Sequence, residues 1–164
     1  MSSIEFIYTD KPLKKLNYSV KDMIGADQVP WVKFSGSPAP GVRFSEEELH
    51  KEAEEAAGHL FPGLKRYLVR ASTTSFQYNR SLPADQRESE RKCLEWLLNL
   101  IRMHLKDGAE KFYYASLWYT FDPDVKKPKM KKIDLAKFIP DDNEFEFGRY
   151  TIWEFVDSSI GRVP

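Results

Sequence analysis

The fold of this chain is decided by the stretch KFYYASLWYTF, residues 111–121, together with EFEFGRYTIWEF, residues 144–155. These two segments hold 11 of the 23 aromatic residues of the chain. Aromatic residues favour strands, and a strand places successive side chains on opposite faces of its sheet. We therefore predict two antiparallel strands here. Either they are buried on both faces, or they leave one aromatic face open to a partner.

The sequence before these strands carries further strand and helix signals. Alternating apolar residues predict strands over residues 4–8, 29–34 and 67–78. A capping box of Ser45 and Glu48 begins one helix. Leucines spaced by three and four residues predict a second helix after Pro83.

This order of elements predicts an α+β fold in a single globular domain, residues 1–164. We expect a mainly antiparallel sheet of about five strands, with both helices packed on one face. A crossover through the second helix would place the 67–78 strand parallel to the 111–121 strand.

Composition restricts the class of protein. The 25 Lys and Arg residues balance the 25 Asp and Glu residues, so no overall field draws the chain to nucleic acid or to an anionic membrane. Cys93 is the single cysteine, which suits a reducing compartment. The sequence begins without a secretory signal pattern and has no apolar run long enough to span a bilayer. We expect a cytoplasmic protein.

One face of the two aromatic strands combines tyrosine and tryptophan with hydroxyls and an arginine, a mixture that protein interfaces enrich. The connector between the strands, residues 122–143, carries six lysines. It is either a basic flap that meets phosphates or an acidic protein, or a solvated hairpin loop kept soluble by its charge. Within it we expect Ile133, Leu135 and Phe138-Ile139 to dock a short strand or turn. The partner we predict is another protein. The candidate binding residues are Tyr114, Trp118, Arg149, Thr151 and Trp153, with Lys127 and Lys131.

The first helix spaces Glu46, His50 and Glu54 by four residues, which places a carboxylate and an imidazole on one helical face. A metal site needs further ligands from another element, and the chain has only three histidines. We therefore interpret these residues as pairs on a solvated helix face and predict no metal. The sequence has no phosphate-binding glycine loop, so we also predict no cofactor.

A short pattern resembles the signatures of ADP-ribosyltransferases. Ser72-Thr73-Thr74 is similar to the Ser-Thr-Ser motif of that family, and Glu144-Phe145-Glu146 is similar to its Glu-x-Glu motif. The resemblance implies that the serine motif supports an NAD-binding core and that Glu146 is catalytic. The family also requires an arginine on an earlier strand, and neither Arg43 nor Arg66 meets this requirement convincingly.

The alternative to protein binding is therefore a small-ligand protein or an enzyme. Its pocket would lie between the sheet and its loops and would contain Arg70, Thr73 and Glu146. Because no complete catalytic pattern is present, the sequence favours a non-catalytic binding protein of inhibitor or immunity type.

Overall fold

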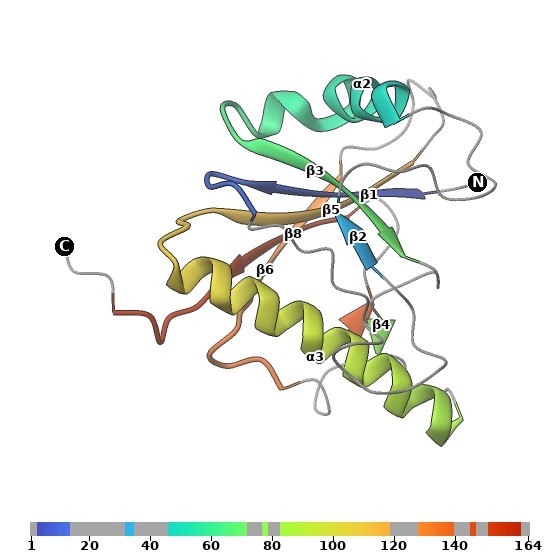
Figure 1. The fold of residues 1–164 in the computed structure, drawn as a ribbon, viewed down its shortest axis with the longest axis vertical. Coiled ribbons are helices and arrows are strands. Elements are labelled where there is room, and N and C mark those ends of the chain that lie inside the picture. The colour runs from blue at the N-terminus through green and yellow to red at the C-terminus, as the bar shows by residue number, and fades with distance from the viewer. Residues whose placement is uncertain are drawn as a thin grey trace.

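A computed structural model describes residues 3–13, 32–34, 46–71, 77–78, 83–118, 128–139, 145–146 and 151–161. Six strands form one sheet in the order β2-β3-β1-β5-β8-β6 (Figure 1). Their bounds are Ser3–Thr9 for β1, Val32–Phe34 for β2, Lys65–Ala71 for β3, Phe112–Trp118 for β5, Lys129–Asp134 for β6 and Thr151–Val156 for β8. The short strands β4 (Gln77–Tyr78) and β7 (Phe145–Glu146) pair with each other.

Two helices accompany the sheet. Helix α2 covers Glu46–Ala57 and continues into the 3₁₀ turn η1 (Gly58–Leu60), whereas α3 covers Ala84–Lys106. Pro83 is the N-cap of α3, and its carbonyl oxygen accepts the first helical hydrogen bond from the Arg87 N–H, at 2.9 Å. After α3 the chain turns through Gly108, whose φ of 99° is left-handed and favours glycine.

The strand pairing confirms an α+β fold with a mainly antiparallel sheet. The aromatic strands β5 and β8 pair antiparallel, with Tyr114 opposite Trp153. The 67–78 and 111–121 strands do run parallel, because β3 and β5 are both antiparallel to β1, but they do not pair with each other, because β1 lies between them. The parallel pair of the sheet is instead β6 with β8.

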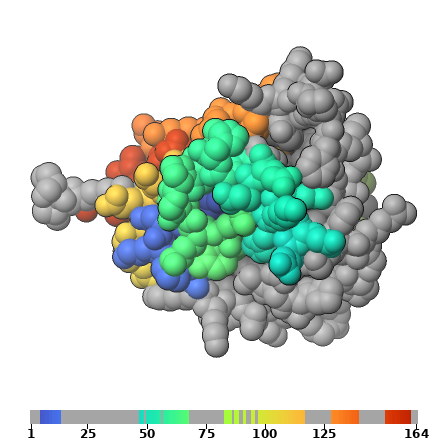
Figure 2. Space-filling view, turned by 90° about the horizontal axis from the view of Figure 1, so that it is seen from above, coloured from blue at the N-terminus to red at the C-terminus, as the bar shows by residue number. Residues whose placement is uncertain are grey.

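The prediction that both helices pack on one face is also wrong. Phe6 and Tyr8 of β1 pack in a cluster with Ala53 of α2, whereas Ile7 packs in a cluster with Leu97 of α3. Because neighbouring strand residues point to opposite faces, α2 and α3 lie on opposite sides of the sheet (Figure 1). Figure 2 looks onto the α2 side, where α2 is cyan, β3 is green and residues 128–139 are orange at the margin.

The physical reason is that the central strands are apolar on both faces, so each face needs a cover. On the α3 side, buried leucines repeat along the helix and meet rings from β5 and β8. We call these packed residues the α3 cluster. Helix α3 contributes six of them: Leu94, Leu97, Leu98, Leu100, Ile101 and Leu105. On the α2 side, Phe61 stacks on Tyr8 with ring centroids 4.2 Å apart.

Several element boundaries differ from those predicted. The predicted strand 67–78 is divided into β3 and β4, and the predicted strand 144–155 is divided into β7 and β8. Of the predicted strand 29–34, residues 32–34 form β2. Ser45, the expected N-cap of α2, lies outside the described residues.

Candidate functional site

The strand register brings four of the predicted binding residues onto one face of the sheet. Tyr114 lies opposite Trp153, and Lys131 lies beside Trp153 in the parallel pair. Thr151 precedes Trp153 by two residues and therefore shares its face. This face packs against α3, and the exposed fraction is 0% for Tyr114, 3% for Thr151 and 8% for Trp153. Of the two alternatives for the aromatic strands, these three side chains therefore follow the buried one, and Lys131 alone of the four is exposed.

A buried carboxyl lies on the same face. The Tyr114 hydroxyl donates a hydrogen bond of 2.7 Å to Glu5 Oε2, which joins β5 to β1. Burial raises the pKa of Glu5, and the Tyr114 hydrogen bond offsets part of that rise. Burial, together with the neighbouring Glu5 charge, raises the pKa of Tyr114 well above its usual value. No sequence pattern pointed to Glu5, because a glutamate within an alternating strand is typical of the solvent face.

The other predicted residues are not assembled by the described strands. Trp118 ends β5 opposite Ser3, and its side chain lies outside the described part. Arg70 lies in β3 of the main sheet, whereas Glu146 lies in β7 of the small sheet, where it pairs with Gln77. The residues that fall outside the described ranges are Thr73, Lys127 and Arg149.

The helix face considered for a metal has a different role. Arg66 lies in β3, contrary to the sequence-based expectation, and its Nε donates a 3.0 Å hydrogen bond to His50 Nδ1. The same guanidinium forms an ion pair with Glu54, so one arginine links α2 to the sheet. Within the residues that the structure describes, no group of three or more His, Cys, Asp or Glu side chains is placed to hold a metal ion.

The last strand of the main sheet, β6, is both charged and accessible. Its side chains Lys129, Lys131 and Lys132 are all exposed, and Met130 between them is 54% exposed. We call Lys129–Lys132 the basic edge. In the sequence this segment belongs to the connector, residues 122–143, for which we predicted either a basic flap or a solvated charged loop. The structure gives it as a strand of the sheet.

The basic edge presents charge on both faces of the sheet. Lys131 lies on the α3 side, where its Nζ is 4.9 Å from the centroid of the Trp153 ring. An ammonium over an indole face is attracted by the ring quadrupole. Lys132 lies on the α2 side in register with Glu154. Glu154 in turn lies opposite Tyr113, and burial together with the Glu154 charge raises the pKa of that tyrosine.

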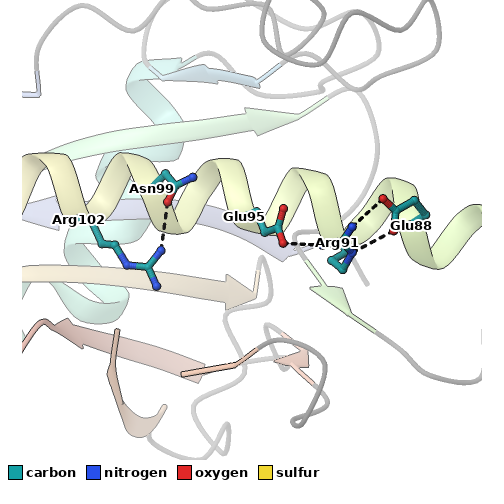
Figure 3. A network of polar contacts seen from close by, with 5 residues as sticks. All are labelled: Glu88, Arg91, Glu95, Asn99 and Arg102. Atoms are coloured by element: carbon teal, nitrogen blue, oxygen red, sulfur yellow. Dashed lines mark hydrogen bonds and ion pairs between the residues drawn. The ribbon is translucent and has the colours of Figure 1, made fainter. Parts of the chain in front are cut away.

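The inner side of β6 is fixed by the core. Ile133 and Leu135 are buried in the α3 cluster, as predicted, and Phe138 packs against it, whereas Ile139 is 53% exposed. Arg102 of α3 donates a 3.1 Å hydrogen bond to the Leu135 carbonyl oxygen. Arg102 also belongs to a row of polar side chains along α3, in which it bonds Asn99 (Figure 3). The basic edge is therefore an exposed margin on a well-packed support.

The turn after β6 is capped by the carboxylate of Asp134. Its Oδ1 accepts hydrogen bonds from the backbone N–H groups of Ala136 and Ser158, at 3.1 and 3.0 Å. A hydrogen bond from the Ser158 side chain, together with these two backbone bonds, lowers the pKa of Asp134. Asp134 is thus engaged by the turn, while Lys129, Lys131 and Lys132 extend from the strand before it.

Comparison of this chain with protein-family models, with curated proteins and with solved structures finds no match. Among the described helices, none is both long and apolar enough to cross a membrane. The candidate site is therefore defined by the structure alone. It is a lysine-rich sheet edge with an exposed methionine.

Proposed function

We propose that this chain is a non-catalytic protein-binding module of inhibitor or immunity type. Its basic edge, Lys129–Lys132, binds an acidic surface of another protein in the cytoplasm. The observation that carries the proposal is the exposure of three lysines and Met130 on the last strand of the main sheet. Charge of one sign around an accessible apolar side chain is a combination that supports specific docking.

Local charge matters here because the chain has no net charge. A long-range field would attract any polyanion, whereas a charged edge within a neutral molecule acts over about a Debye length, roughly 8 Å at physiological salt. This arrangement favours a partner that fits the edge closely. It also predicts binding that weakens as salt concentration rises.

Photo-crosslinking tests the proposal by contact. A photoreactive residue replaces Met130, and a matched control replaces Met103 of α3, which is 66% exposed against 54% for Met130. We expect adducts from position 130 that contain acidic peptides of a partner, and few from position 103. Equal adducts at both positions, or none at position 130, would contradict the proposal.

Charge reversal identifies what the partner recognises. We expect K129E/K131E/K132E to reduce the adducts at position 130 by about tenfold or more, because opposed charges become like charges. The control K51E/K65E/K111E changes the net charge equally at three exposed lysines outside β6. Equal loss in both variants would mean that overall charge, and not the basic edge, governs binding.

A further inference from the structure

We propose that the acidic partner contributes an extended segment that pairs with β6 as an added strand. This inference rests on the proposed function and specifies how the basic edge is used. In the described sheet β6 has a strand on one side only, β8, because β6 ends the strand order. A sheet edge presents backbone N–H and C=O groups that a partner strand can bond.

The backbone direction along β6 follows from one hydrogen bond. The Leu135 N–H donates to the Val156 carbonyl oxygen at 2.8 Å, directly after the parallel pair of β6 and β8. In a parallel pair, every second residue turns both backbone groups toward the neighbouring strand. Lys131 and Ile133 therefore bond toward β8, whereas Met130 and Lys132 turn their N–H and C=O groups outward.

The end of the strand agrees with this alternation. Asp134 shares the outward set with Met130 and Lys132, and its carbonyl oxygen accepts a 3.0 Å hydrogen bond from the Lys137 N–H in the following turn. The outward carbonyl oxygen of Asp134 is thus occupied by the turn. The groups of Met130 and Lys132 are the ones left in position for an added strand.

The side chains specify the chemistry of that strand. Lys129 and Lys131 lie on the α3 side, while Met130 and Lys132 lie on the α2 side. An added strand with acidic residues at alternate positions would place its carboxylates beside Lys129 and Lys131. Its intervening apolar residues would then meet Met130.

A second copy of this chain fits the edge poorly. Pairing β6 with β6 would bring lysines against lysines, and like charges on adjacent strands destabilise a pair. Lysines on an edge strand commonly prevent such self-pairing. The same lysines favour an acidic strand, so the partner is a different protein segment.

Two synthetic peptides of the same length and composition test the inference. One alternates glutamate and valine, and the other contains the same residues in shuffled order. We expect the alternating peptide to bind at least about fivefold more tightly, because only alternation places all carboxylates on one face of a strand. On binding, amide hydrogen exchange measured by NMR should slow about tenfold or more at Met130 and Lys132.

A backbone variant provides an independent readout. Met130→Pro removes an outward N–H without removing a bond to β8, and edge strands tolerate proline at such positions. We expect M130P to retain its thermal unfolding transition and to lose the preference for the alternating peptide. Met130→Ala shortens the same side chain but keeps the N–H, so it should retain that preference. Loss of the preference in both variants, or in neither, would contradict strand addition.

The outcomes separate the two proposals. If both peptides bind equally and K129E/K131E/K132E weakens both, strand addition is wrong and the proposed function stands. If the alternating peptide binds without slowing exchange at Met130 and Lys132, strand addition is also wrong. If neither peptide binds, strand addition is overturned, and crosslinking at position 130 then decides the proposed function.

Discussion

Glu5 is a half-buried glutamate whose carboxylate accepts a hydrogen bond from one tyrosine hydroxyl. Burial raises its pKa because the charged form loses water, and the 2.7 Å bond from Tyr114 recovers part of that loss. The folded-state pKa therefore lies above the unfolded value of 4.5. A folded state that binds the proton more tightly is favoured at low pH, so this contribution to stability is lost as pH rises through the folded pKa.

We predict that Glu5→Gln removes this pH dependence. The free energy of unfolding of the variant minus that of the wild type should increase from pH 4.5 toward pH 8, because only the wild type must bury a charge. Urea denaturation across this range measures the difference. Tyr114→Phe is the control: it removes the donor, raises the pKa of Glu5 further and should extend the loss to higher pH. A difference that does not change with pH would contradict this account.

Among the elements, α2 and α3 are held by arginines in different ways. Arg66 of β3 bonds both His50 and Glu54, so it connects α2 to the sheet. Arg91 bonds Glu88 and Glu95, all within α3 (Figure 3). The Arg66 contacts join two separate elements, β3 and α2, whereas the Arg91 contacts stabilise a single helix locally.

We predict that Arg66→Lys lowers the free energy of unfolding by about 1 kcal/mol, because a lysine ammonium cannot reproduce the two-partner fork of a guanidinium. Amide exchange should increase across α2. Arg91→Lys is the matched control on α3 and should change stability by less than about 0.5 kcal/mol, as expected for pairs within a helix. Equal effects of the two substitutions would mean that Arg66 does not fix α2.

At the scale of the whole molecule, the main sheet is an apolar layer between two different covers. Its α3 side holds the larger cluster, with buried leucines against Phe112 and Phe155. Its α2 side holds a smaller cluster in which two alanines allow the helix to approach Phe6 and Tyr8. Since β1 contributes side chains to both clusters, the packing on the two sides of the sheet depends on the same strand.

We predict that the two sides unfold together. Leu97→Ala should cost about 2–5 kcal/mol and Phe61→Ala about 3–5 kcal/mol, because both side chains are buried in apolar clusters. Each variant should show coincident transitions by circular dichroism and tryptophan fluorescence. Leu60→Ala is the control: this neighbour of Phe61 is 39% exposed and should cost less than about 1 kcal/mol. Separate transitions would show that the two sides unfold independently.

Prediction from the sequence succeeded where the signal is local. Leucine spacing predicted α3, aromatic alternation predicted β5 and β8, and buried Ile133 and Leu135 were recognised within the connector. For the candidate site, Lys131 was identified, and the other lysines of the basic edge were recognised only as part of a charged connector. The helix placement failed, because alternation in β1 predicted one apolar face, whereas Ile7 on the opposite face is also fully buried and packs against α3.

The composition of each element can be read from the sequence alone: apolar rings on the aromatic strands, leucines on α3 and lysines on the connector. Three features required the folded chain: the partnership of Glu5 with Tyr114, the position of β1 between β3 and β5, and the position of the lysines on the last strand. The physical reason is the range of the interactions. Helix and strand preferences arise within a few neighbouring residues, whereas strand order and register depend on pairing between segments far apart in the chain.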